Sequence, residues 1–495
     1  MKKDVTKLNR GSSTLEILIA FTLLTITLST VVLVIFDNQS LYTAIENNSE
    51  ALYKTVKTIE DVKVKSKNNF LAAISTSSQE VSSGIVFLKE LNVIDISPCK
   101  KQVGATTEWT TMKAKPQTIE MVTILSDIKT AIGLGGDCAS QTPKSDWKNP
   151  AKYASATISP GNPTSLDELN KVVYIGSDKP PFIHIASTTY ATKNQNSNIL
   201  ETYTNNFDLK NTPNSIDAVR YFSLNKIYLF SAISSSTKQL AIIDVTEPKK
   251  PSVIYKGLSQ CVSGSYPQGW LTYFYKNTLY LTTRYTAGPE FHIFDVTDPL
   301  NPIEYPLTSS NCRGLELGDS VNDIVVQDQI VDGAVKRFAY LATDEIDKEL
   351  RVFDVTNPLS VKEVLQANQN LPGSQNGMSL FSIGNKLFLG RQSAPTGPDL
   401  YIYDTSNPIT GLTLIKSVDI GTGIYSMRVA GKYLFISTPK SNQELQVWNI
   451  ENISNITNIA KYNSGNIALR GIDFNSDFIY TTGQSTTNFQ IIHTP

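Results

Sequence analysis

Histidine, cysteine and charged residues are scarce in this chain of 495 residues. It has three histidines and four cysteines, and none of the cysteines has the C-x-x-C spacing of common zinc sites. Charged residues make up 18% of the chain, below the roughly 25% of ordinary soluble domains. Lysine and arginine total 44 against 45 acidic residues, so the net charge of -1 provides no bulk attraction to nucleic acid.

Familiar enzyme motifs are also missing. The chain has no H-E-x-x-H zinc motif, no G-x-S-x-G nucleophile turn, no phosphate-binding Walker loop and no EF-hand loop. The three histidines, His184, His292 and His493, lie in separate apolar segments, where packed or solvated side chains are the ordinary case. We therefore expect a protein that is not an enzyme, with no catalytic residues, no metal site and no cofactor.

One long apolar run, Leu15–Phe36, stands out, with Glu16 its only charge and neither proline nor glycine within it. As a helix, its 22 residues would be about 33 Å long, enough to cross a hydrocarbon core of about 30 Å. A cleaved signal peptide would have a shorter apolar region of about 7–15 residues. Four basic residues precede the run against the single acidic Asp4, so we expect a cytoplasmic N-terminus and the rest of the chain outside.

The junction before this run has a distinctive sequence, RGSSTLE at residues 10–16. It resembles the leader junction of type IV pilins and of type II secretion pseudopilins. The resemblance implies that residues 1–11 are a leader, that prepilin peptidase cleaves after Gly11, and that Ser12 becomes the methylated N-terminus. It also implies that Glu16 pairs with the N-terminal amine of a neighbouring subunit during filament assembly. The family usually has an aromatic residue or methionine at the position where this chain has Ser12.

The helix is expected to continue beyond the membrane. Glu16 also completes a capping box with Ser13, which would satisfy amides at the helix start whether or not subunits assemble. From Tyr42 onward, five of seven heptad positions are apolar, and no proline occurs before Pro98. We therefore predict a pilin-like helix over 12–70, transmembrane at 15–36, with the heptad face packed.

A small connecting region is predicted over 71–150, with both helix and strand. The pattern favours a strand at 84–89 and a helix over 118–132 that ends at Gly133. Cys99 and Cys138 flank much of this region and could cross-link it in an oxidising compartment.

Beyond residue 150 the chain repeats itself. Five apolar segments end in an Asp or Asn, at intervals of 45 to 59 residues, and each has another apolar strand upstream. Four of them continue with a proline four residues later. The anchor residues are Asp244, Asp295, Asp354, Asp404 and Asn449. Degenerate copies at 171–187 and 477–493 bring the number of copies to seven.

The repeat predicts strands joined by Asx turns, in which the anchor side chain accepts hydrogen bonds from later backbone amides. The D-V-T-x-P corner resembles the LVIVD-repeat family of β-propellers. The overall fold is therefore expected to be mainly β, with a propeller of about seven blades over 151–495. Since the last copy ends after three strands, residues 152–159 should supply its fourth.

Cys261 and Cys312 each lie 17 residues after an anchor, Asp244 and Asp295 respectively. They therefore occupy equivalent loops of consecutive blades and are predicted to form a disulfide.

These features predict a minor or tip-located pilin-like subunit of a type IV pilus or related filament. Its propeller would face outside the cell for adhesion or binding of an unidentified ligand. Its expected partners are prepilin peptidase, other pilin-like subunits and the cytoplasmic membrane. Two alternatives remain open: a pseudopilin of a secretion or DNA-uptake machine, and a single-pass membrane receptor or enzyme whose Gly11 is incidental.

Overall fold

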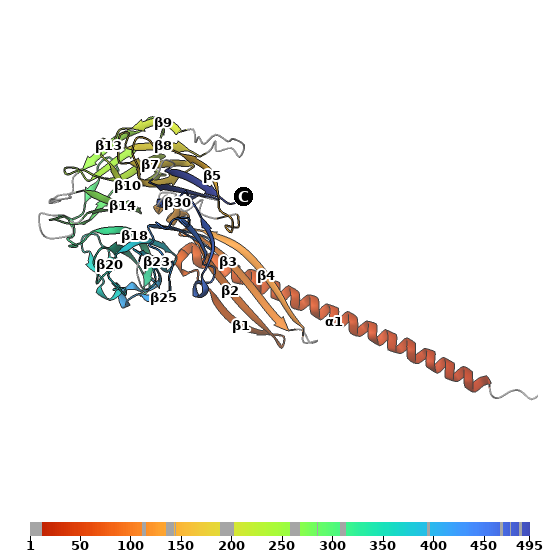
Figure 1. Cartoon of the computed structure of the whole chain (residues 1–495). Helices are drawn as coiled ribbons and strands as arrows, with labels where there is room; N and C mark the ends of the chain where they lie inside the picture. The colour runs from red at the N-terminus through yellow and green to blue at the C-terminus, as the bar shows by residue number, and fades with distance from the viewer. Residues whose placement is uncertain are drawn as a thin grey trace, which may run out of the picture. The chain divides into compact units, whose positions relative to one another are not determined.

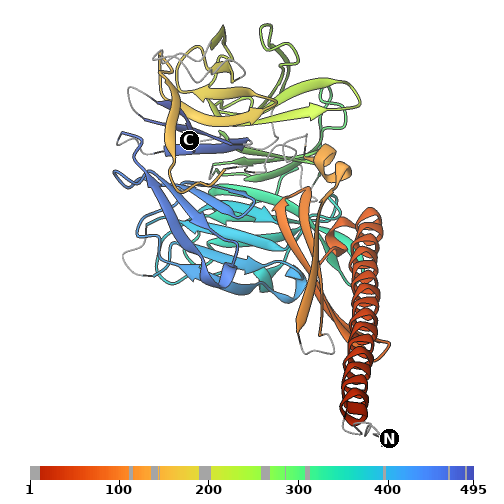
Figure 2. The same cartoon turned by 90° about the vertical axis from the view of Figure 1, so that its right-hand side faces the viewer.

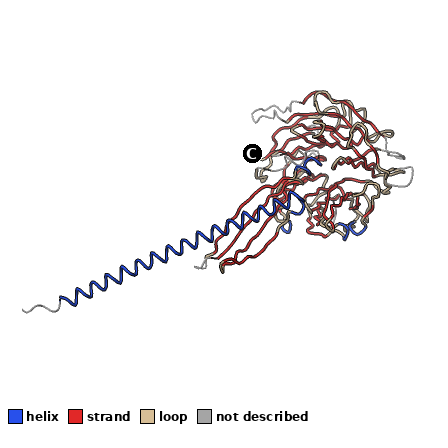
Figure 3. The backbone as a smooth tube through the Cα atoms, turned by 180° about the vertical axis from the view of Figure 1, so that it is seen from behind, coloured by secondary structure: helices blue, strands red, loops and turns tan. Residues whose placement is uncertain are grey.

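The computed structural model is mainly β, with one long N-terminal helix (Figures 1 and 3). The chain forms two compact units, one of 1–93 with 103–123 and one of 94–102 with 124–495. The structure describes residues 12–110, 115–134, 143, 145–188, 202–257, 268–284, 286–306, 313–393, 397–465, 469–475, 477–484 and 488–495.

In the first unit, α1 (Ser12–Asn68) is one continuous helix of 57 residues, as the sequence predicts. Most of the predicted heptad face is not buried, however, since Tyr42 and Ile45 are mostly exposed, although Ile59 is buried. The buried positions include Ala51 and Thr55, whose small side chains let aromatic residues of the neighbouring sheet approach the helix. The heptad pattern was therefore the wrong guide to the packed face.

The sheet that packs on α1 has the order β1-β2-β3-β4. Its strands are β1 (Thr76–Ser82), β2 (Ile85–Ser97), β3 (Lys100–Thr110) and β4 (Pro116–Ser126). Phe87 and Trp109 pack against Ala51 from this sheet. Lys54 of α1 is also buried there, where its ammonium lies 2.5 Å from a carboxylate oxygen of Glu80.

The helix predicted over 118–132 is wrong for most of its length. Residues 116–126 form β4, in which side chains alternate in exposure as they do in a half-buried strand. Only α2 (Ile128–Gly133) is helical, and Asp127 caps it by accepting a hydrogen bond from the Lys129 amide at 3.0 Å. The predicted strand at 84–89 is confirmed as the start of β2.

The second unit contains seven four-stranded antiparallel sheets. The first sheet is formed by β6 (Pro163–Leu169), β7 (Val172–Ser177), β8 (Ile183–Ser187) and β9 (Thr202–Phe207), and the second by β10 (Pro213–Tyr221), β11 (Lys226–Ile233), β12 (Leu240–Asp244) and β13 (Ser252–Gly257). The third sheet is formed by β14 (Gly269–Tyr275), β15 (Thr278–Thr283), β16 (Phe291–Asp295) and β17 (Ile303–Glu304). The fourth is formed by β18 (Val321–Val331), β19 (Ala334–Thr343), β20 (Leu350–Asp354) and β21 (Lys362–Glu363).

The remaining three sheets follow the same plan. They are formed by β22 (Gly377–Ile383), β23 (Lys386–Arg391), β24 (Leu400–Asp404) and β25 (Thr413–Val418); β26 (Ser426–Ala430), β27 (Tyr433–Ser437), β28 (Leu445–Asn449) and β29 (Thr457–Tyr462); β30 (Leu469–Asn475), β31 (Phe478–Gly483), β32 (Phe489–His493) and β5 (Ala151–Ala156). The strand β5 therefore supplies the fourth strand of the last sheet, as predicted, by pairing antiparallel with β32.

The first strands of the seven sheets contact one another in cyclic order. Each contacts the first strand of the next sheet along the chain, and β30 of the last sheet contacts β6 of the first. The sheets can be followed by colour, from yellow through green to blue, in Figures 1 and 2.

A β-bulge occurs at the second residue of the first strand in six of the seven sheets. The extra residue stands outside the pairing register, and such bulges re-aim a side chain. We call the six residues the bulge ring: Thr164, Asn214, Trp270, Asn322, Met378 and Arg470.

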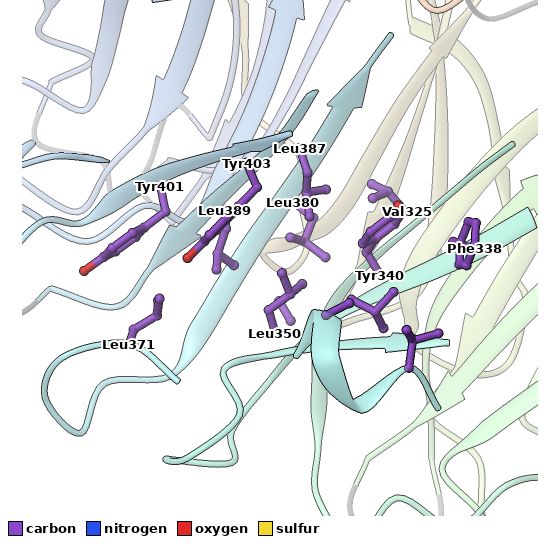
Figure 4. Close-up of a cluster of buried hydrophobic side chains, with 14 of the residues drawn as sticks. Val325, Phe338, Tyr340, Leu350, Leu371, Leu380, Leu387, Leu389, Tyr401 and Tyr403 are labelled. Carbon is purple, nitrogen blue, oxygen red and sulfur yellow. The ribbon is translucent and has the colours of Figure 1, made fainter. Parts of the chain in front are cut away.

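The core of the second unit is divided into layers between adjacent sheets. Figure 4 shows one layer, in which Phe338 and Leu350 of one sheet lie with Leu387, Leu389 and Tyr403 of the next. Each such buried side chain contributes about 1.5–3 kcal/mol relative to exposure, so the facing sheets stabilise each other.

Candidate functional site

The N-terminal half of α1 presents an exposed apolar surface over residues 17–36. Leu18 and Phe36, near its two ends, are 68% and 65% exposed. Among the described residues, α1 is the one helix long and apolar enough to cross a membrane. An apolar surface of this extent requires lipid or the apolar side chains of another chain to cover it.

Threonine hydroxyls in this half of the helix are satisfied internally. Thr22 donates to the Leu18 carbonyl at 2.7 Å, and Thr30 donates to the Ile26 carbonyl at 2.7 Å. Thr25 and Thr27 make similar hydrogen bonds to the preceding turn. These polar side chains can therefore lie in an apolar environment without leaving an unpaired donor.

The predicted cleavage and assembly residues lie at the start of this helix. Gly11 is outside the described residues, and α1 begins at Ser12. Glu16 lies in the first turns of α1, where the structure describes the backbone but not the side chains. The roles of Gly11, Ser12 and Glu16 therefore stay predictions.

All five anchor residues form Asx turns. In each, the side-chain oxygen accepts a hydrogen bond from the backbone amide two residues later, at 2.7 to 3.0 Å. The five acceptors are Asp244, Asp295, Asp354, Asp404 and Asn449. Each anchor thereby fixes the turn between the third and fourth strands of its sheet, which is a structural role.

A second repeated position was missed in the sequence. In several sheets, the residue five positions before the end of the third strand is buried and polar. Its side chain accepts hydrogen bonds from backbone amides of the loop that leads to the next sheet. Glu290, for example, accepts from Leu317 at 2.8 Å, and Asn488 accepts from Ile158 at 2.6 Å. The full set with such bonds is Glu290, Glu349, Asp399, Glu444 and Asn488. The constant offset of five was the signal that could have found them.

Carboxylates on the first strands join neighbouring sheets. Each accepts a backbone amide from the next first strand, over 2.5 to 2.8 Å. The pairs are Asp167 with Ala218, Asp217 with Phe274, Asp323 with Leu380 and Asp473 with Glu168. The last pair connects the final sheet to the first.

The electrostatics of these carboxylates are unusual. Burial disfavours their charged form and raises the pKa of Asp217 to about 7 and that of Asp323 to about 6. The positive charge of Arg428 acts in the opposite direction on both pKa values. Its Nε atom lies 3.2 Å from an oxygen of Asp473. Perturbed carboxylates can mark catalytic sites, but here each one is hydrogen-bonded to backbone in a joint between sheets.

The described histidine and acidic side chains of His292 and Asp344 bond to protein groups. His292 is fully buried, with its two ring nitrogens 2.7 Å from Glu304 Oε1 and 3.0 Å from the Pro289 carbonyl oxygen. An oxygen of Asp344 accepts hydrogen bonds from the side-chain amides of Asn322 and Asn376, both at 2.6 Å. Within the described ranges, no group of three or more His, Cys, Asp or Glu residues has metal-binding geometry.

The cysteine pairings fall mostly outside what the structure describes. Cys138, Cys261 and Cys312 are outside the described residues. Cys99 is buried at the end of the β2–β3 hairpin and is disulfide-bonded, but its partner is not among the described residues. Both predicted pairings therefore stay predictions.

Comparisons with known proteins add little to this geometry. No family model matches the chain, and no curated protein matches it. Among solved structures, the computationally designed Ika8 protein is 9% identical, with a TM-score of 0.43, and the match covers 69% of this chain and 99% of that one. Sqt1 of Saccharomyces cerevisiae is 7% identical, with a TM-score of 0.44, covering 70% of this chain and 99% of Sqt1.

Proposed function

We propose that this protein is a pilin-like subunit, minor or tip-located, that is anchored by α1 and displays a β-propeller outside the cell. The observation that carries the proposal is the form of α1. One uninterrupted helix begins at Ser12, exposes an apolar half of membrane-spanning length, and packs one face of its other half against a four-stranded sheet. This is the arrangement that the leader resemblance at 10–16 implies.

The head is best interpreted as a seven-bladed propeller. Seven four-stranded sheets whose first strands contact one another in cyclic order support this interpretation. The strand β5 supports it further, because it joins the start of the head to the last sheet and covers the edge of β32. The function proposed for this head is adhesion or binding of an extracellular ligand.

Processing at the leader is the first test. When the protein is co-expressed with a prepilin peptidase, mass spectrometry should find a mature chain that begins at Ser12. Gly11→Val should block this cleavage, while Asn9→Ala, two residues upstream, serves as the control and should be processed. A mature N-terminus elsewhere, or no processing, would overturn the leader assignment.

Assembly is the second test and concerns the charge of Glu16. If Glu16 serves only as a helix cap, Glu16→Gln should be nearly silent, because glutamine can fill the same role. If its carboxylate pairs with a neighbouring N-terminal amine, the substitution leaves that amine without a partner in an apolar environment, which is costly. We expect Glu16→Gln to lower incorporation into sheared surface filaments at matched membrane levels. Equal incorporation, or no filament association of the wild type, would favour a membrane-anchored propeller without a filament.

A further inference from the structure

The bulge ring places six re-aimed side chains at corresponding ends of neighbouring first strands. Hydrogen bonds show how close these ends lie. The side-chain amide of Asn214 donates to the Gly269 carbonyl at 2.7 Å, and that of Asn322 donates to the Gly377 carbonyl at 2.7 Å. Each of these two residues therefore reaches the start of the next first strand, and Trp270 lies directly beside the contact that Asn214 makes.

Half of the bulge ring, Trp270, Met378 and Arg470, consists of residue types that are common in the cores of protein interfaces. The cores of protein interfaces are enriched in Trp, Tyr, Phe, Met and Arg and depleted in Lys, Glu, Asp, Ser and Ala. The ring contains one Trp, one Met, one Arg, two Asn and one Thr, and none of the depleted types. All six side chains are half-buried or exposed.

Trp270 differs from the other tryptophans of the chain. Trp109, Trp147 and Trp448 are buried, at 4%, 0% and 9% exposure. Trp270 is only half-buried, and the guanidinium of Arg284 lies over its ring, 4.2 Å from the centroid. This stacking holds both side chains in place before any partner arrives, which lowers the entropy cost of binding.

The carboxylate beside the bulge ring, that of Asp344, is hydrogen-bonded to Asn322 and Asn376, whereas two arginines can receive a partner's charge. Arg284 and Arg470 are both exposed, and neither is ion-paired with a carboxylate of the described part of the chain. An exposed guanidinium beside an aromatic ring favours a carboxylate that lies next to an apolar side chain.

We propose that the bulge ring is a docking surface for a protein partner, and that Trp270 and Arg284 receive an acidic segment of that partner. The inference rests on the proposed function only in placing the head outside the cell. The proposal identifies the ligand class as a protein segment that carries a carboxylate beside an apolar residue.

The test uses the purified full chain in detergent and two arrays, one of short synthetic peptides that vary in acidic and apolar content and one of glycans. We expect acidic peptides to bind. Binding should weaken about tenfold or more in Trp270→Ala, as is usual for a central aromatic anchor, and also in Arg284→Glu. Because Arg284 is exposed, its variant should fold even if Trp270→Ala does not.

The matched control is another arginine stacked on an aromatic ring, located at the opposite end of a first strand. The guanidinium of Arg220 lies 5.4 Å from the ring centroid of Phe222, which follows β10 and is 45% exposed. Phe222→Ala should leave peptide binding unchanged.

Three results would overturn the proposal: binding of glycans but not peptides, binding of no probe, or equal peptide binding by wild type and Arg284→Glu. Filament incorporation of the wild type and of Arg284→Glu, measured in parallel, keeps this test separate from the proposed function. If the wild type is incorporated normally but binds no peptide, the docking surface alone is rejected.

Discussion

The carboxylate of Asp473 accepts a hydrogen bond from the backbone amide of Glu168 at 2.8 Å, although the two residues are 305 positions apart. Asp473 is on β30 of the last sheet, and Glu168 is on β6 of the first. The same bond recurs between other neighbouring first strands. The buried carboxylate of Asp473 thus joins the last sheet to the first in the same way as Asp167, Asp217 and Asp323 join their sheets to the next ones.

Removing this carboxylate should destabilise the protein. In Asp473→Ala, the Glu168 amide loses its acceptor and Arg428 loses the carboxylate beside it, so we expect a loss of about 1–3 kcal/mol in the free energy of unfolding. Chemical denaturation of the full chain in detergent measures this loss. Glu247→Ala, which removes a carboxylate from an exposed turn, should change the free energy by less than about 0.5 kcal/mol. Equal stability of Asp473→Ala and wild type would contradict the joining role.

Stability should increase as the pH is lowered toward mildly acidic values. Burial raises the pKa of Asp217 to about 7 and that of Asp323 to about 6, whereas an unfolded Asp titrates near 3.9. Between about pH 4 and pH 7, these two carboxyl groups therefore hold more protons in the folded chain than in the unfolded chain, and their contribution to the free energy of unfolding falls as the pH rises.

The double variant Asp217→Asn, Asp323→Asn should show a flatter dependence. Asparagine does not titrate, and its side-chain oxygen can still accept the amides of Phe274 and Leu380. The measurement is the free energy of unfolding of both proteins between about pH 5 and pH 8. An unchanged pH dependence in the double variant would rule out these two carboxylates as its source.

Loss of β5 should destabilise the second unit. A chain that begins at Thr164 lacks β5 and leaves the edge of β32 unpaired, whereas a chain that begins at Asn149 keeps it. We expect the shorter chain to melt at a lower temperature and to aggregate more readily, because an unpaired edge strand is a template for association. Equal melting temperatures would mean that β5 contributes nothing to closure.

Disulfide pairing can be determined by peptide mapping under non-reducing conditions. Four cysteines allow three pairings, of which we expect Cys261 with Cys312 and Cys99 with Cys138. A cross-link between Cys99 and either Cys261 or Cys312 would contradict the expected pairing and the division between connecting region and head.

The sequence by itself determined the features whose causes are local. The apolar run at Leu15–Phe36 is a property of composition, and the Asx turns at residues such as Asp354 depend on one side chain and an amide two residues away. The pairing of β5 with the last sheet could also be predicted, because the last copy of the repeat has three apolar strands where four are expected. Each of these signals lies within a few residues or within one repeat.

Only the tertiary structure decided the rest. The segment 118–126 has apolar residues that suit a helix or a strand, and pairing within the sheet selects the strand. The packed face of α1 was decided by the aromatic residues Phe87 and Trp109 that reach it from the sheet. Asp473 and Glu168 could not be paired from the sequence, because their contact depends on the packing of the last sheet against the first, which no local pattern encodes.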